Sequence, residues 1–212
     1  MSAEGVRAGG RAALGPGDVI RGARPGLIAS HLWGFFFPAI AGGFTPSLEF
    51  WTAALYVTVP LGLLIYGWND YFDADVDSVS RRKHHAPTAA AFGPALDPAR
   101  RASLPLTILL AQIPFATLWA LDGRLDLVVW MLLMALGNAL YNGPGVRFSR
   151  LPILAELTAT SIYLLIVWLG VLTHSRPPAL WAWLFAGMAF LNLQILGAMA
   201  DRLDDATVGK RT

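Results

Sequence analysis

Apolar stretches of about twenty residues recur along most of this chain, and this feature restricts its fold more than any other. A helix needs about twenty consecutive apolar residues to cross the hydrocarbon core of a bilayer. Charged residues make up 14% of the sequence, well below the roughly 25% that is typical of soluble domains. We therefore expect an all-α integral membrane helical bundle of about six spans, at residues 27–43, 48–68, 104–121, 127–141, 153–172 and 179–200.

The sequence before the first span differs in composition. Residues 1–25 are rich in Gly, Ala and Arg and lack the apolar core of a cleavable signal peptide. We expect a disordered basic leader over residues 1–25, followed by one membrane domain over residues 26–212. Because the chain has no cysteine, disulfide scaffolds, thiol nucleophiles and iron–sulfur clusters are excluded.

The basic residues alternate between the connections of the predicted bundle. Fourteen of the sixteen Lys and Arg residues precede the first span or follow the second, fourth and sixth spans, and only Arg124 and Arg176 lie on the opposite connections. Basic residues accumulate on the cytoplasmic side of a membrane. We therefore expect a multi-pass protein of the cell (inner) membrane with both termini cytoplasmic. The net charge of +2 then reflects topology, and no nucleic-acid partner is expected.

Seven of the fourteen acidic residues fall in two short segments, residues 70–77 after the second span and residues 201–205 after the sixth. On a helix, Asp70, Asp73 and Asp77 share one face, from which Asp75 is displaced, and Asp201 and Asp205 are one turn apart. Like charges so placed repel one another, so a cation is needed to offset them, and hard oxygen ligands suit Mg²⁺. Because Mg²⁺ combines one or two carboxylates with substrate phosphates, the clusters predict a diphosphate held between metal ions.

Three motifs resemble those of a known family. Residues 69–77 (NDYFDADVD) resemble the NDxxDxxxD motif of the UbiA-type intramembrane prenyltransferases. Residues 201–205 (DRLDD) and 209–212 (GKRT) are similar to the family's second DxxxD motif and its Gly-basic-Thr tail, and residues 141–150 (YNGPGVRFSR) resemble its Tyr…Pro…Arg loop. The resemblance covers residues 25–212. It implies Mg²⁺-dependent transfer of a prenyl group from an isoprenoid diphosphate to an aromatic or lipophilic acceptor within the membrane.

The resemblance also implies roles for individual residues. The residues expected to hold metal ions are Asn69, Asp70, Asp73 and Asp77 for one ion and Asp201 and Asp205 for the other. Those expected to contact the substrate, mainly through its phosphate oxygens, are Lys83, Arg147, Arg150 and Lys210, together with Tyr141, Asn69 and Asp70. Stabilisation of the leaving diphosphate is the expected catalytic act, with Asp73, Asp77, Asp201, Asp205 and Arg147 as the catalytic residues.

The chain departs from the family in length. UbiA-type enzymes usually have about nine membrane helices, whereas this sequence stops directly after the second motif and six predicted spans. We expect an incomplete chain in preference to a compact variant that completes its cavity by association, because bundles rarely leave a polar cavity open to lipid. The motifs name neither the acceptor nor the length of the prenyl chain nor the oligomeric state.

Two other classes of function stay open. A cation transporter or channel could use clustered aspartates, but its acids are expected near the bilayer midplane, and these clusters lie at the ends of spans. A non-catalytic assembly partner could retain the motifs and depend on a second chain.

Several residues outside the three motifs are also candidates for a role. Polar groups are costly in lipid, so those within the spans are expected to face the bundle interior: Gln112, Asn138, Glu156, Asn192 and Gln194. Glu156 is a candidate base or acceptor-orienting group, with structural pairing as the alternative. The connection 73–103 is long enough to cover a cavity. Aromatic faces can stabilise an allylic cation, and the candidates are Trp68, Tyr71, Phe72, Tyr141 and Tyr163.

Overall fold

The computed structural model describes residues 13–73, 77, 81–84, 89, 93, 95–151, 153–173 and 176–207, and for Arg81, Arg82 and residues 200–207 it describes the backbone alone. All regular elements within these ranges are helical. In chain order they are α1 (Pro16–Gly22), α2 (Pro25–Gly42), α3 (Leu48–Tyr56), α4 (Val59–Gly62), the π-helical turn η1 (Leu63–Gly67), α5 (Trp68–Phe72), α7 (Arg81–His84), α9 (Pro98–Arg101), α10 (Leu104–Leu121), α11 (Leu125–Asn142), the 3-10 turn η2 (Phe148–Arg150), α12 (Leu154–Leu172) and α13 (Leu180–Thr207).

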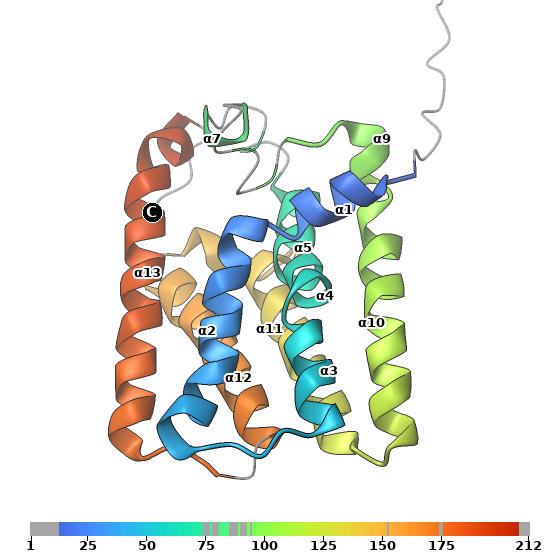
Figure 1. The fold of residues 1–212 in the computed structure, drawn as a ribbon. Helices are drawn as coiled ribbons and strands as arrows, with labels where there is room; N and C mark the ends of the chain where they lie inside the picture. Colours follow the sequence, from blue (N-terminus) through green and yellow to red (C-terminus); the bar gives the residue numbers. More distant parts are fainter. Residues whose placement is uncertain are drawn as a thin grey trace, which may run out of the picture.

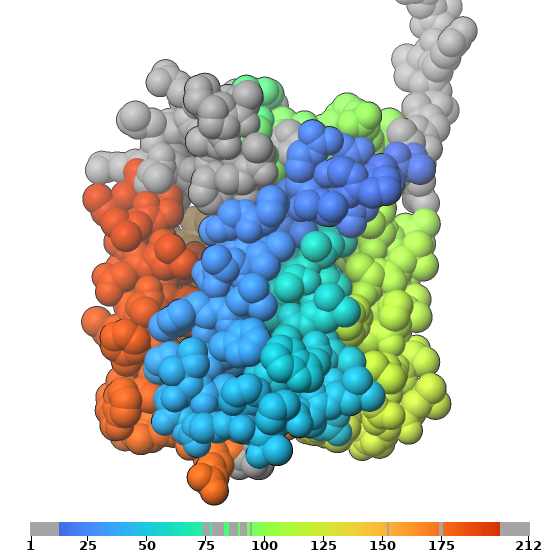
Figure 2. Space-filling model, viewed as in Figure 1, coloured from blue at the N-terminus to red at the C-terminus, as the bar shows by residue number. Residues whose placement is uncertain are grey.

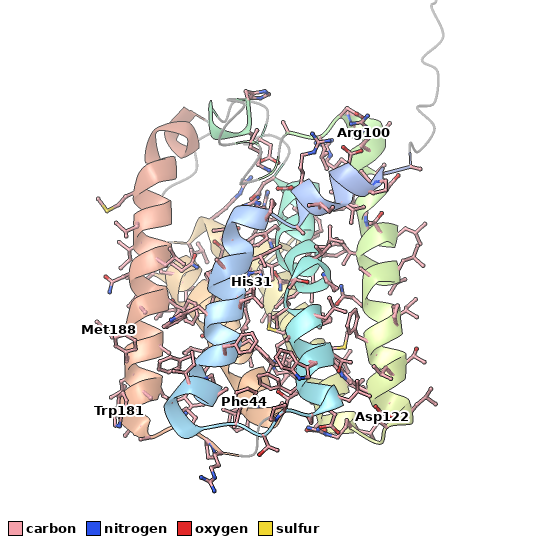
Figure 3. All side chains as sticks on the ribbon, in the orientation of Figure 1. His31, Phe44, Arg100, Asp122, Trp181 and Met188 are labelled. Carbon is pink, nitrogen blue, oxygen red and sulfur yellow. The ribbon has the colours of Figure 1, made fainter. Side chains whose placement is uncertain are left out.

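The long helices run side by side between two ends of a bundle (Figure 1). In this view α10 and α13 form opposite edges, α2 and the segment from α3 to α5 lie between them, and α11 and α12 lie behind. One end carries α1, α7, α9 and the C-terminal part of α13. The other end carries the connections around Phe44 and Asp122, which are labelled in Figure 3. The described parts of the N-terminal segment, of the 73–103 connection and of the C-terminal segment therefore lie at one end.

Among the residues that the structure describes, five helical segments are long and apolar enough to cross a membrane: Leu48–Phe72, Pro98–Leu121, Leu125–Asn142, Leu154–Leu172 and Leu180–Met199. Large apolar side chains cover their outer faces, as Trp181 and Met188 on α13 illustrate (Figure 3). The predicted all-α membrane bundle is confirmed. Helix α2, the first predicted span, has 18 residues but includes His31 and Pro38, and it is not among the five.

Helices α2 and α12 pack closely because one position on α12 has no side chain. A Cβ atom on Gly170 would lie 2.3 Å from the carbonyl oxygen of Phe35, so only glycine lets the two backbones approach this far. Phe35 and Ile166 are fully buried beside this contact. This packing joins the first predicted span to the fifth.

The helical segment Leu48–Phe72 is interrupted near Pro60, which has no N–H group to donate. Side chains from neighbouring helices bind two backbone carbonyl groups at the interruption: His31 Nδ1 lies 3.0 Å from Val57 O, and Gln112 Nε2 donates to Pro60 O at 3.0 Å. Because a carbonyl oxygen only accepts, His31 carries its proton on Nδ1 and accepts through Nε2 from the Tyr66 hydroxyl at 3.0 Å. His31 is thus a buried residue that binds groups on two sides of the break (Figure 3).

The described part of the predicted leader is ordered. Residues 16–22 form α1, which packs against η1 and α4, and Arg24 is 7% exposed. In the space-filling view this blue segment lies against the cyan segment from α3 to α5 (Figure 2). Within the predicted leader, the structure therefore describes a short helix and a buried Arg24 that has a buried acidic partner. Residues 1–12 lie outside the described residues.

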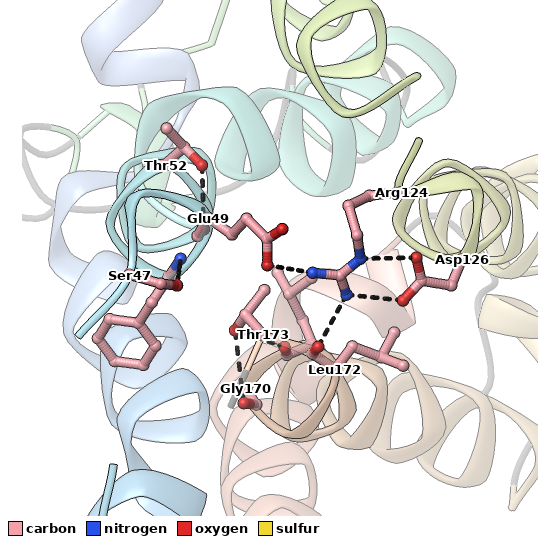
Figure 4. A network of polar contacts seen from close by, with 10 residues as sticks. Ser47, Glu49, Thr52, Arg124, Asp126, Gly170, Leu172 and Thr173 are labelled. Carbon is pink, nitrogen blue, oxygen red and sulfur yellow. Dashed lines mark hydrogen bonds and ion pairs between the residues drawn. The ribbon is translucent and has the colours of Figure 1, made fainter. Parts of the chain in front are cut away.

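At the end opposite α1, Arg124 joins three segments (Figure 4). Its guanidinium donates to both carboxylate oxygens of Asp126, at 3.0 and 2.7 Å, to Glu49, and to the carbonyl oxygen of Leu172 at 2.8 Å. Beside it, the Ser47 hydroxyl accepts from Phe50 N at 3.0 Å and caps α3. Arg124 therefore holds the ends of α3, α11 and α12 together.

Candidate functional site

The first acidic motif begins on α5 and continues past its end. Asp70 lies on α5, and Asp73 is the residue at which the helical conformation stops, with φ −101° and ψ 31°. Backbone hydrogen bonds from Asp73 N to Asn69 O (2.9 Å) and from Asp77 N to Asp73 O (2.8 Å) keep successive acids about one turn apart. Asp70, Asp73 and Asp77 are all buried. Asp75 lies outside the described residues.

Each of these three carboxylates is paired with a cation from a different part of the chain. Arg24 Nη2 lies 2.7 Å from Asp70 Oδ1. Lys83 Nζ contacts Asp70 Oδ1 as well and lies 2.8 Å from Asp77 Oδ2. Asp70 and Asp77 therefore converge on one ammonium group. Burial raises the pKa of Asp77 to about 6, against the effect of Lys83, which lowers it.

Asp73 takes a different direction from the other two acids. Arg147 Nη2 lies 2.6 Å from Asp73 Oδ1 and also donates to the carbonyl oxygen of Phe72 at 2.9 Å. Arg147 follows the turn after α11 and has a positive φ of 47°. The contact with Asp73 brings the loop that carries Arg147 to the first motif. Helix α5 ends at Phe72 with Asp73 at its C-cap, and the carboxylates of Asp70 and Asp77 meet Lys83 whereas that of Asp73 meets Arg147.

Arg24 is a residue of this cluster that sequence reasoning missed. The prediction assigned it to the leader, yet its guanidinium pairs with Asp70 and lies 4.8 Å from the centroid of the Tyr66 ring. Its φ of 53° is uncommon for a residue other than glycine. The available signal was its place directly before Pro25, where a helix can begin.

The 73–103 connection covers this cluster where it is described. Gly93 is buried with φ +84°, and a Cβ atom there would lie 3.1 Å from Arg21 O and 3.8 Å from Asp70 Oδ2. A cavity of about 320 Å³ is lined by Asp70, Asp77, His84, Ala95, Leu96, Asp97, Pro98 and Arg101. The long connection thus forms part of a cavity wall beside the two carboxylates that share Lys83.

Comparison with known proteins decides the family. The model of the UbiA prenyltransferase family matches residues 27–212. This chain belongs to the UbiA prenyltransferase family. The resemblance carried by the three motifs is confirmed at the level of the family.

Three curated UbiA-like relatives have names that refer to carotenoids. A lycopene elongase/hydratase of Corynebacterium glutamicum is 26% identical over 155 residues, which cover 72% of this chain and 52% of that protein. A lycopene elongase/hydratase of Haloarcula japonica is 28% identical over 167 residues, with 74% and 51% covered. The C(50) beta-cyclic carotenoids biosynthesis protein LbtBC of Dietzia sp. is 26% identical over 133 residues, with 63% and 27% covered.

This UbiA-family chain spans about half the length of the lycopene elongase/hydratases that it matches. No solved structure matches it.

The second acidic motif of this UbiA-family chain lies at the same end of the bundle as the first. Asp201 and Asp205 belong to the C-terminal part of α13, which reaches the end that carries α7 and α9 (Figure 1). Their backbone is helical, so they are one turn apart as predicted. Lys210 lies outside the described residues. The two motifs therefore share an end of the bundle.

The structure also describes three other residues of the predicted site. Asn69 is half-buried on α5, Tyr141 is half-buried on α11, and Arg150 is half-buried on η2. Because η2 packs against both α11 and α12, the loop that carries Arg147 and Arg150 is fixed between two membrane helices.

The donor set of the first motif fits a hard divalent cation. Asp70 and Asp77 converge on one cation, and Asp70 Oδ2 is buried without a hydrogen-bond partner. Within the residues that the structure describes, no group of three or more His, Asp or Glu side chains could hold a metal ion. Further ligands would therefore come from substrate phosphates and from residues whose side chains lie outside that description.

The polar residues inside the spans behave differently from one another. Gln112 and Asn138 are hydrogen-bonded inside the bundle, as predicted. Asn192 is exposed and donates to Met188 O at 2.9 Å, so its predicted inward orientation is wrong, and α13 satisfies the amide within its own backbone. Glu156 Oε2 is buried without a partner among the described residues, and it stays a candidate.

Proposed function

We propose that this UbiA-family chain transfers a prenyl group from an isoprenoid diphosphate to a lipophilic acceptor in a Mg²⁺-dependent reaction. The observation that carries the proposal is the meeting of the first-motif carboxylates with Arg24, Lys83 and Arg147 at one end of a membrane bundle. A diphosphate carries several negative charges, so its site needs fixed cations beside carboxylates that can hold divalent ions.

The cations of the chain would bind the leaving diphosphate. Arg24 and Arg147 each have a buried Nε atom without a hydrogen-bond partner among the described residues, so each can still donate to an anion. A guanidinium binds phosphate oxygens through two parallel donors, whereas Lys83 supplies a compact charge. Cations fixed in this way stabilise the negative charge that develops as the allylic C–O bond breaks.

The metal would be held by Asp70 and Asp77 from the first motif and by Asp201 and Asp205 from the second. Mg²⁺ bound there would neutralise charge on the leaving diphosphate. Asp73 would position Arg147, since the two groups are 2.6 Å apart.

The same end of the bundle would protect the reacting carbon. The 73–103 connection covers the carboxylates where it is described, and this cover would limit the access of water to an allylic cation. Trp68 stacks on Tyr71 with ring centroids 5.8 Å apart and meets Phe72 edge-on at 5.4 Å. These rings could offer their faces to the cation.

We propose a carotenoid-type polyene as the acceptor class. The names of three relatives refer to lycopene or to carotenoid biosynthesis. An apolar polyene dissolves in the bilayer core and could reach a site within the bundle from the lipid. The distribution of basic residues supports a cell-membrane protein whose site end and termini face the cytoplasm.

The test uses the full chain in lipid nanodiscs with Mg²⁺, a panel of labelled prenyl diphosphates, and lycopene as the acceptor. We expect prenylated product, and a loss of diphosphate release of about 100-fold in Asp73→Asn and Asp201→Asn. The control Asp122→Asn removes an exposed acid at the opposite end and should keep the activity. Unchanged release in both motif variants would contradict the proposal, and ion flux without turnover would favour a transporter.

A further inference from the structure

We infer that Lys83 is a resident counter-ion that excludes a divalent metal from the first motif until the diphosphate arrives. The inference rests on the proposed function and adds an order of binding to it. Lys83 Nζ donates to Asp70 Oδ1, and to Asp77 Oδ2 at 2.8 Å. Its side chain is 1% exposed. The ammonium therefore occupies the point on which the two carboxylates converge.

Among the described side chains that pair directly at this point, the formal charges balance. Asp70 and Asp77 contribute two negative charges, and Lys83 and Arg24 contribute two positive ones. A divalent cation that approaches a neutral buried cluster gains little net attraction. It would also displace Lys83 from both of its partners, and moving a buried ammonium away from its partners is costly. Metal alone is therefore a poor ligand for this site.

A diphosphate changes both conditions. It adds negative charge to the cluster, and its oxygens give Lys83 a new partner, so the ammonium can leave the carboxylates without losing its hydrogen bonds. The cavity of about 320 Å³ beside Asp70 and Asp77, which Arg101 also lines, offers room for such an anion. Metal and diphosphate should therefore bind together at this motif.

The experiment measures Mn²⁺ binding to the full chain in nanodiscs by equilibrium dialysis. The readout is Asp70-dependent binding, which is the amount of Mn²⁺ bound by each protein minus the amount bound by the same protein with Asp70→Asn. This subtraction removes any Mn²⁺ held by the second motif. For the wild-type chain we expect this binding only when inorganic pyrophosphate is present. For Lys83→Met we expect it without pyrophosphate, with an affinity at least about tenfold above that of the wild type.

Two matched variants control for charge and for location. Lys83→Arg keeps a cation between the carboxylates and should behave as the wild type does. Arg100→Met removes a cation from the same end of the bundle, where Arg100 is 47% exposed beside Asp18 and Asp97, and it should leave Mn²⁺ binding unchanged. Thermal unfolding supplies a second readout, because Mn²⁺ alone should raise the midpoint of Lys83→Met and not that of the wild type.

Three results would overturn the inference. If wild-type chain binds Mn²⁺ through Asp70 equally well with and without pyrophosphate, Lys83 does not exclude the metal, and the proposed prenyl transfer is unaffected. If Lys83→Met folds but still binds Mn²⁺ through Asp70 only in the presence of pyrophosphate, a group other than Lys83 excludes the metal. If no Asp70-dependent Mn²⁺ binding occurs under any condition, both the inference and the proposed metal-dependent function fail.

Discussion

The two ends of the bundle each carry a polar cluster built around arginine. The clusters differ in whether their buried donors and acceptors all have hydrogen-bond partners. At one end, every nitrogen of the Arg124 guanidinium donates a hydrogen bond, and its acidic partners Glu49 and Asp126 are 35% and 44% exposed. At the other end, the side chains of Arg24 and Asp70 are 8% and 2% exposed, and the atoms Arg24 Nε and Asp70 Oδ2 have no partner among the described residues.

This difference separates a structural cluster from a binding site. A guanidinium in which every nitrogen already donates, and whose acidic partners are partly solvated, mainly holds segments together. Buried donors and acceptors without partners are costly, and their presence calls for a ligand or ordered water. The comparison predicts that substitutions at the Arg24 end change activity, whereas those at the Arg124 end change stability.

The largest effect is expected from Arg24→Met. The change removes a cation from Asp70 and from the proposed diphosphate site, so diphosphate release should fall by about 100-fold. Breaking a buried ion pair should also lower the free energy of unfolding by about 3 kcal/mol. Rates per folded protein and thermal unfolding measure the two effects. An activity loss no larger than that of Arg124→Met would remove the distinction between the ends.

Gly93→Ala tests whether the 73–103 connection must lie close to Asp70. The new Cβ atom would meet Arg21 O at 3.1 Å in a backbone conformation with φ +84°, so the connection should shift. We expect a decrease of about tenfold in the rate of diphosphate release, and a loss of about 1 to 2 kcal/mol in stability. Gly123→Ala is the control at the opposite end, since its φ is +73° but no atom lies within 4 Å. Equal rates in the two variants would contradict the proposed cover.

Arg124→Met should destabilise the protein without changing its chemistry. The variant loses its contacts with Glu49, Asp126 and Leu172 O, but exposed partners limit the cost to about 1 to 2 kcal/mol. Diphosphate release per folded molecule should stay within about twofold of the wild type. Thermal unfolding and rates measured well below the midpoint test this expectation, and a large drop in rate would show that the two ends are coupled.

The smallest effect is expected from Ser47→Ala. The change removes the hydroxyl that accepts from Phe50 N at 3.0 Å and caps α3, which should cost about 0.5 to 1 kcal/mol. Ser47→Thr keeps a capping oxygen and should recover most of the loss in the unfolding midpoint. Neither variant should alter the rate of diphosphate release. A changed rate in both variants would indicate that the Arg124 end belongs to the site.

The sequence predicted most of the fold because lipid imposes a simple length rule. The predicted spans 104–121, 127–141 and 153–172 agree with α10, α11 and α12 within two residues at either end. It did not predict that residues 48–72 would contain a break at Pro60 and a π-helical turn, because His31 and Gln112, which bind carbonyl groups at that break, come from other helices. Local patterns carry no information about such partners.

The sequence predicted the acidic residues of the candidate site but only some of its cationic residues. Asp70, Asp73, Asp77 and Arg147 were named from the motifs and Lys83 from the family resemblance, and the structure brings them to one end of the bundle. Arg24 was missed because its partner is 46 positions away, and a Gly- and Arg-rich segment reads as disordered when considered alone.

The sequence by itself determined the class of structure and the positions of most of the long helices, and it predicted a kind of ligand, since apolar length and acidic spacing act locally along the chain. The tertiary structure decided which cation faces which carboxylate. Asp73 meets Arg147 while Asp70 and Asp77 share Lys83, because α5 stops at Asp73 and sends that carboxylate toward the loop after α11. Pairing across the bundle depends on where helices end and how they pack, and no single segment of sequence contains that information.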